Sequence, residues 1–153
     1  MKRLHSKIIK TGIFSALGAI SLFVGSWALA EGAFDAQKNI ALPIEQREFQ
    51  NINPAIKMAA AYGNRSKGGH GSFGQFPANF ETPSHIHSGA YHGVVIKGVM
   101  TNPFKGEANP PSLKPGSYWY VPAGSEHTTA CISEVPCEFY FYAEGAFDFK
   151  PVK

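Results

Sequence analysis

The sequence predicts an all-β protein, and three observations point to this class. Short segments rich in β-branched and aromatic residues recur along the chain with turn residues between them. No stretch after residue 30 shows a sustained 3.6-residue apolar period, which an amphipathic helix would require. The 153 residues include 16 glycines and 11 prolines, which suit the many corners of a β-sandwich or barrel. This length, with 44% hydrophobic residues, indicates a single domain with one core.

The first thirty residues have the composition of a secretory signal peptide. A basic start precedes an apolar run from Ile13 to about Val24, and the segment ends in Ala28-Leu-Ala30, a small-residue pattern typical of a cleavage site. The apolar run is shorter than the ~18 to 20 residues that a membrane span needs, although an uncleaved anchor is the alternative. We therefore expect cleavage and a periplasmic or secreted protein without a stable membrane anchor.

The charge of the chain argues against nucleic acid as a partner. The formal net charge is +3, but residues 1–30 carry four basic residues and no acidic one, so the rest of the chain has a net charge of −1. Lysine and arginine residues do not cluster with stacking aromatics. We expect a small-molecule partner, and a homodimer is the expected assembly because two-fold pairs are common.

The predicted elements follow the chain in order. Residues 31–54 are expected to be an extended arm with pieces of edge strand, because two prolines interrupt any regular run, and residues 55–150 form the single predicted domain. Residues 56–62 fit a strand or a short helix, and the glycine-rich loop that follows favours a strand. Further strands are expected at 70–75, 80–87, 91–101, 117–121, 127–132 and 137–143.

Four histidines are placed so that they could meet at one point. His85 and His87 share one face of a predicted strand and lie about 7 Å apart along it. After a short turn, His92 begins the returning strand, and His127 begins a later one. Imidazole is the usual nitrogen ligand of transition metals, so these four residues predict a site for one divalent ion, with Zn, Fe, Mn, Ni and Cu all open.

Two of the histidines have alternative interpretations. His92 could instead orient a ligand or act as a general base, whereas His85, His87 and His127 are the core of the predicted site. His70, between two glycines, is expected in a loop or on the surface.

The two cysteines of the chain are predicted to form a disulfide. Cys131 and Cys137 lie in two predicted strands joined by residues 133–136, so the thiols can face each other across a hairpin. Export to an oxidising compartment favours the bond, and a pair of reduced core thiols is the alternative.

The two histidine segments resemble the two sequence motifs of the cupin superfamily. The first motif places Gly, then His-x-His, then Glu and Gly; the matching positions here are Asn79, His85, His87, His92 and Gly98. The second places Gly, Pro-x-Gly, His and Asn; the matching positions are Gly116, Pro122, Gly124, His127 and Cys131. The change from Glu to His92 exchanges an anionic oxygen ligand for a neutral nitrogen ligand and leaves a more positive metal centre.

More narrowly, the chain resembles the single-domain, ChrR-like cupins grouped as DUF4437. This resemblance covers about residues 40–150 and includes the glycine-rich segment 63–69, the histidine pattern and the closing Gly-Ala-Phe-Asp-Phe at 145–149. It implies a conical β-barrel, the double-stranded β-helix or jelly roll, with a metal near its centre. It does not supply an activity.

Two functions fit a site of this kind. The first is a metal-dependent enzyme of dioxygenase, isomerase or lyase type that acts on a small organic molecule, with Tyr91, Tyr118 or Tyr120 as candidate proton donors. The second is a non-catalytic module that binds or senses a metal or a small ligand. Some relatives are sensor domains of anti-sigma factors, but the signal peptide argues against a cytoplasmic regulator. A metal-free structural cupin would require the four histidines to be incidental.

Overall fold

The computed structural model describes residue 35 and residues 37–153, and the predicted signal peptide lies outside this part. The described residues contain short strands and one 3-10 turn, so the chain is all-β as predicted. None of their helical segments has the length and hydropathy of a membrane span. The elements are η1 (Ile44–Gln46), β1 (Gln50–Asn51), β2 (Lys57–Gly63), β3 (His70–Phe76), β4 (Phe80–Glu81), β5 (His85–Ile86), β6 (Tyr91–Lys97), β7 (Met100–Thr101), β8 (Tyr118–Val121), β9 (Ala130–Cys131), β10 (Cys137–Ala143) and β11 (Lys150–Pro151).

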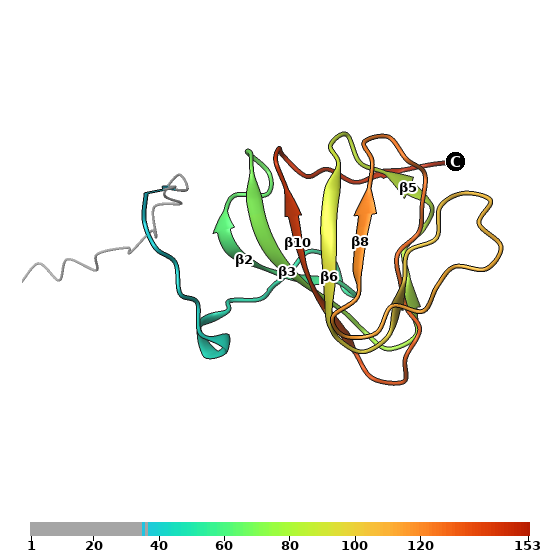
Figure 1. Ribbon diagram of the computed structural model, residues 1–153, viewed down its shortest axis with the longest axis horizontal. Coiled ribbons are helices and arrows are strands. Elements are labelled where there is room, and N and C mark those ends of the chain that lie inside the picture. The colour runs from blue at the N-terminus through green and yellow to red at the C-terminus, as the bar shows by residue number, and fades with distance from the viewer. Residues whose placement is uncertain (1–34, 36) are drawn as a thin grey trace, which may run out of the picture.

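One six-stranded antiparallel sheet forms a wall of the domain. Its strand order is β1-β2-β3-β10-β6-β8, and Figure 1 shows the five longer strands of this sheet side by side. Strand β10, near the C-terminus, lies between β3 and β6 and pairs with both. Alternate residues along these strands are buried, as expected for a sheet with one face on the core.

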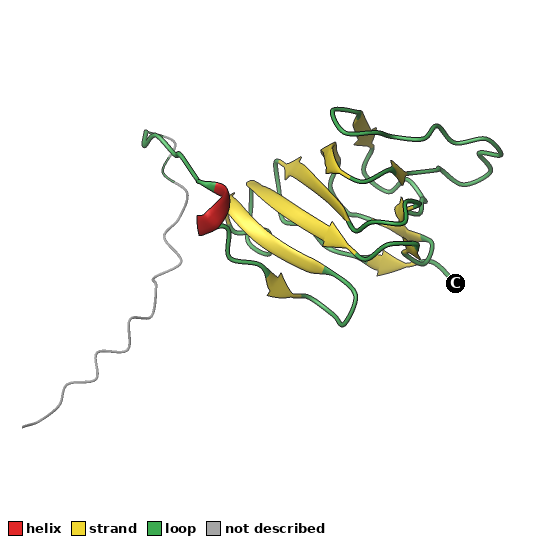
Figure 2. Cartoon of the chain, turned by 90° about the horizontal axis from the view of Figure 1, so that it is seen from below, coloured by secondary structure: helices red, strands yellow, loops and turns green. Residues whose placement is uncertain are grey.

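Two smaller sheets, β4-β9-β7 and β11-β5, form the opposite side. A β-bridge between His85 and His127 links the two. The apolar core includes Phe139 and Phe141 from the large sheet together with Met100 and Cys131 from the small one, so it lies between the walls. Figure 2 shows the strands from below, with one long loop projecting at the right. This is the predicted jelly-roll barrel.

Several motif positions have a left-handed backbone. Gly98, Gly116 and Gly124 have φ angles of 79°, 89° and 73°, which glycine adopts without steric cost. Asn79 stands where the family motif has glycine and has a φ of 55°. Asparagine is one of the few other residues that tolerates this conformation, so the turn survives the substitution.

The strands expected at 80–87 and 91–101 are each divided in two. The chain leaves one small sheet after β4 and joins the other at β5, and Pro83 lies between the two strands. Gly98 turns the chain between β6 and β7. The strand expected at 56–62 is confirmed as β2, shifted by one residue, and β10 coincides with its predicted range.

The predicted disulfide is present and joins β9 to β10. The sulfur atoms of Cys131 and Cys137 are 2.06 Å apart, and the described residues contain no free cysteine. The bond ties the small sheet that follows His127 to the central strand of the large one.

The predicted arm contributes an edge strand, because β1 pairs with β2. Arg47, between η1 and β1, forms an ion pair with Glu138 of β10, and both side chains are largely buried. The arm is therefore attached to the large sheet from residue 47 onward.

Candidate metal centre

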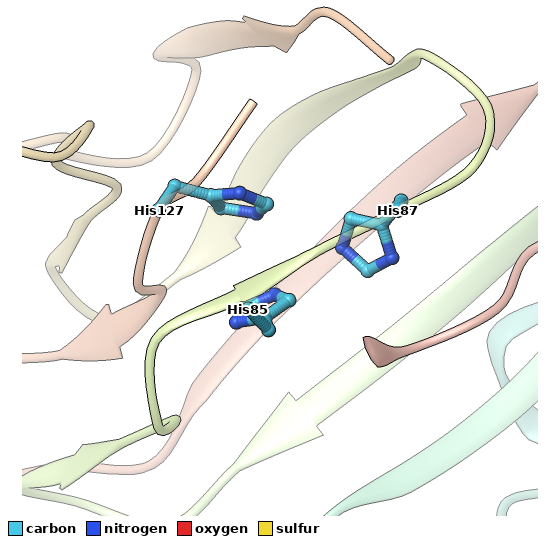
Figure 3. A group of neighbouring side chains, drawn as sticks. All are labelled: His85, His87 and His127. Atoms are coloured by element: carbon cyan, nitrogen blue, oxygen red, sulfur yellow. The ribbon is translucent and has the colours of Figure 1, made fainter. Parts of the chain in front are cut away.

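Three of the predicted ligands meet inside the barrel. His85 and His127 exchange two backbone hydrogen bonds of 3.0 Å, which places their side chains next to each other. His87 follows two residues after His85 on the same face. One ring nitrogen from each of the three residues lies within 4.8 Å of the others, and all three side chains are at most 3% exposed. Figure 3 shows the rings of this histidine triad turned toward one space from two separate segments.

Backbone carbonyls orient all three rings in the same way. The Nδ1 atom of His85 lies 2.8 Å from the carbonyl oxygen of Pro83, and that of His127 lies 2.9 Å from the carbonyl oxygen of Ser125. The Nδ1 atom of His87 bonds the carbonyl oxygen of Asp148. A carbonyl oxygen only accepts, so each Nδ1 carries the proton and each Nε2 presents a lone pair.

Burial keeps the triad neutral. It lowers the pKa of His85 and of His87 to about 4, because the charged imidazolium loses its hydration inside the barrel, and neighbouring imidazoles add to the effect. The pKa of His127 is lowered for the same first reason. Neutral imidazole is the form that binds metal, so the site is in its ligating state at neutral pH.

His92 does not belong to the triad, which corrects the prediction of a fourth ligand. In β6, Tyr91, Gly93 and Val95 face the core, so the alternation of the strand puts His92 on the outer face. There its Nδ1 lies 2.5 Å from the Tyr118 hydroxyl.

The three candidate tyrosines also lie on different faces of the sheet. Tyr118 and Tyr120 lie on the outer face and are 56% and 44% exposed, so they do not line the site. Tyr91 faces inward, and its hydroxyl lies 3.2 Å from Nε2 of His127 and 3.4 Å from Oδ1 of Asn102. Burial raises the pKa of Tyr91 to about 12, so the hydroxyl keeps its proton.

His70 is buried, contrary to the surface position expected for it. Its side chain is fully inaccessible, its Nδ1 lies 3.0 Å from the Ser72 hydroxyl, and its ring contacts the edges of Phe141 and Phe147. Its glycine neighbours suggested a loop or surface position, but His70 is the first residue of the strand expected at 70–75, which extends to Phe76, and its side chain is buried.

The segment 144–149, here called the C-terminal strap, was not predicted to take part in the site. Phe147 stacks on His87 and Phe149 stacks on His85, with ring centroids 4.1 and 4.2 Å apart. The alternation of Phe147, Asp148 and Phe149 indicates a strand with both aromatic rings on one side, and this was the available signal. Phe147 also packs against Phe141 of the core, so the strap contacts both the triad and the core.

A small cavity lies behind the triad. Its volume is about 60 Å³, and its walls are mainly aromatic and aliphatic side chains of both sheets and the strap. His85, His87 and Tyr91 reach it, so the triad communicates with an apolar space inside the barrel.

Comparison with known proteins identifies solved structures of similar architecture. The polyketide cyclase RemF from Streptomyces resistomycificus is similar over 76% of this chain and 87% of its own, with a TM-score of 0.64 at 14% identity. An RmlC-like cupin from Shewanella frigidimarina is similar over 71% and 92%, with a TM-score of 0.57 at 17% identity. The DMSP lyase DddQ from Ruegeria pomeroyi is similar over 70% and 56%, with a TM-score of 0.52 at 17% identity.

At these identities the likeness concerns the fold alone, and it confirms a cupin domain. None of the curated proteins compared with the chain shows significant sequence similarity. The family model described as a domain of unknown function, DUF4437, matches residues 46–153. These residues include the whole barrel and the triad, so the chain has the cupin fold and belongs to the DUF4437 family.

Proposed function

We propose that this protein is an exported metal-dependent enzyme that acts on a small organic molecule. The observation that carries the proposal is the common orientation of the triad: backbone carbonyls hold three Nδ1 atoms, which leaves the three Nε2 atoms as ligands for one ion. Without an ion, Nε2 of His127 accepts a hydrogen bond from the Tyr91 hydroxyl. Metal-binding histidines typically donate their other ring N–H to a fixed acceptor such as a backbone carbonyl. Export and a homodimeric assembly remain predictions from the sequence.

The donor set fits a divalent transition metal. Zn, Fe, Mn, Ni and Cu all accept imidazole nitrogen, and the triad includes no carboxylate. Three protein ligands leave at least one coordination position for an oxygen of water or substrate, as catalytic sites require. A bound metal would supply Lewis acidity to that oxygen.

The residues around the triad favour proton-transfer chemistry. The Tyr91 hydroxyl is protonated at neutral pH and lies beside His127, where it can donate to a substrate atom. Phe147 and Phe149 exclude water from the same space. Isomerisation or elimination therefore fits better than dioxygen chemistry, and structural likeness to a cyclase and to a lyase supports this choice.

The second candidate function is a non-catalytic module that binds or senses a metal or a small ligand. The specific observation in its favour is the C-terminal strap, which stacks on two of the three histidines and leaves the triad almost inaccessible. A carrier or sensor can keep its ligand covered, whereas an enzyme must admit a substrate.

Elemental analysis of protein purified from its exported location without chelator tests the proposal. We expect one divalent transition metal per chain, and X-ray absorption should show three nitrogen ligands and at least one exchangeable oxygen. A coordination shell filled by protein atoms would favour the carrier. Protein that binds no metal, even after incubation with each of the five ions, would exclude the metal enzyme and the metal carrier, and would leave only a module that binds a small ligand.

A further inference from the structure

The large sheet extends beyond the small sheets that cover its inner face. Ser72, Gly74 and Phe76 alternate along β3, and Phe76 belongs to the core, so these residues mark the inner face. Met58 and Ala60 of β2 lie opposite Gly74 and Ser72 and share that face. Met58 still packs against the core, whereas Ala60 is exposed. At β2, therefore, the rest of the described chain leaves the inner face of the sheet partly uncovered.

A hollow of about 300 Å³ lies on this uncovered face. Met58 and Ala60 line it together with polar side chains of the arm and of the loop after β2, which are Gln46, Glu48, Gln50, Asn64 and Arg65. Met58 also lines the cavity behind the triad. This side chain thus lies between the hollow and the cavity, and whatever covers the hollow also closes this end of the barrel.

The hollow contains one acidic and one basic side chain that are not used within the chain. Glu48 and Arg65 both line it, and neither forms an ion pair with another residue of the described part. A surface with one charge of each sign is complementary to a copy of itself, because a two-fold axis brings the acidic residue of each copy toward the basic residue of the other.

The arm that leads to the hollow has an aliphatic side. Ile40, Leu42 and Ile44 alternate in the sequence, so an extended chain places them on one side. Ile40 is 53% exposed and Ile44 is 66% exposed. Figure 1 shows this part of the chain standing apart from the sheet, before η1. An aliphatic side next to a ring of polar groups is the composition of a protein–protein contact, with an apolar centre and a polar rim.

We propose that two copies of this chain associate through the arm and the inner face of β2, about a two-fold axis that places Glu48 of each copy beside Arg65 of the other. The aliphatic arm of each copy covers the hollow of its partner and closes the barrel next to Met58. This inference goes beyond the proposed function and does not depend on a bound metal.

Exchange of the two charges tests the contact. Sedimentation velocity of the exported protein should give the mass of two chains at micromolar concentration. Glu48→Arg alone, or Arg65→Glu alone, should weaken self-association about tenfold, because both contacts of the pair become repulsive. An equimolar mixture of the two variants should regain the dimer as a heterodimer, since both contacts then join opposite charges. Added salt should reduce the difference between the mixture and the separate variants.

A second pair of variants tests the aliphatic arm. Ile44→Asp puts a charge into the apolar centre of the contact and should give the mass of one chain. The matched control is Ile132→Asp, which changes an isoleucine that is 47% exposed and lies outside the arm and the hollow, and it should keep the dimer. The wild-type measurement and the mixture do not depend on how well Ile44→Asp folds.

Three results would overturn the inference: a wild-type protein that is monomeric at every concentration, a mixture that stays monomeric, or dissociation by Ile132→Asp as complete as by Ile44→Asp. A monomer that binds glycine in the hollow would also overturn it, because both charges would then serve a zwitterionic ligand. Failure of the proposed function is distinguishable, because it appears as absent metal in elemental analysis and leaves the mass unchanged.

Discussion

Phe147 stacks on the ring of His87, with 4.1 Å between centroids and 26° between planes. The backbone carbonyl of the next residue, Asp148, accepts a hydrogen bond from Nδ1 of the same histidine. One short segment therefore fixes both the rotation of the ring and its tautomer. The closing residues of the domain thus position a histidine of the triad that lies sixty residues earlier in the sequence.

The first prediction concerns this contact. Phe147→Ala removes the stacking surface of His87 and opens the strap, so a bound metal should dissociate faster, measured by transfer to an excess of chelator. Stability should fall by about 2 kcal/mol, less than for a fully buried phenylalanine, because this side chain is only half-buried. The matched control is Ile132→Ala, which removes an exposed apolar side chain. Equal dissociation rates in the two variants would contradict a role for the strap.

The second prediction separates the triad from His92. His87→Ala and His127→Ala each remove one of three converging nitrogens, so metal stoichiometry should fall from one to near zero, measured by elemental analysis after dialysis. His92→Ala acts on the outer face of β6 and should keep the full stoichiometry. Loss of metal in the His92 variant would return this residue to the coordination shell.

The third prediction concerns pH in the absence of metal. Burial, with the nearby Arg65 charge, lowers the pKa of His70 to about 4 in the folded state, whereas the unfolded state has the ordinary value near 6.5. Between these values the unfolded chain binds the extra proton and the folded chain does not. The free energy of unfolding should therefore decrease as pH falls from 6.5 to 4, by about 1.4 kcal/mol per pH unit for each such histidine.

Replacement of His70 isolates the contribution of this residue to the pH dependence of the free energy of unfolding. Between pH 6.5 and 4, His70→Gln should reduce the slope of the free energy of unfolding against pH by the equivalent of about one bound proton. Urea unfolding of chelator-treated protein measures this slope. Above pH 7 the residue is neutral in both states, so the pH dependence of variant and wild type should run parallel there. An unchanged slope below pH 6.5 would show that His70 is protonated in the folded state.

The sequence was sufficient to predict the fold class, the disulfide and the convergence of three of the four singled-out histidines. His85, His87 and Cys131 with Cys137 could be placed because local spacing decides which side chains share a face or meet across a hairpin. Motif glycines mark the turns that close the barrel, and their positive φ angles agree with that interpretation.

The predictions that were wrong concern residues whose position depends on strand pairing and tertiary contacts. His92 and Tyr91 are adjacent, and only the pairing of β6 with β8 and β10 settles which of the two faces the core. Local alternation indicates that both aromatic rings of the strap lie on one side, but it does not show what they contact. Their contacts with His85 and His87 join residues about sixty positions apart. His70 was misplaced because flanking glycines are as compatible with a crowded strand as with a loop. Tyr140 and Tyr62 lie where a Cβ on Gly71 would be.

The last prediction concerns the disulfide. It closes a loop of only five intervening residues, so the double variant Cys131→Ser, Cys137→Ser should lose about 2 kcal/mol of stability in urea unfolding. Thiol titration of the unfolded wild-type protein should find no free sulfhydryl. Cys131 is the last residue of β9, and its side chain belongs to the hydrophobic core and not to the triad, so metal stoichiometry should stay at its wild-type value. Loss of the metal in a variant that remains folded would mean that the bond positions His127 as well as the sheet.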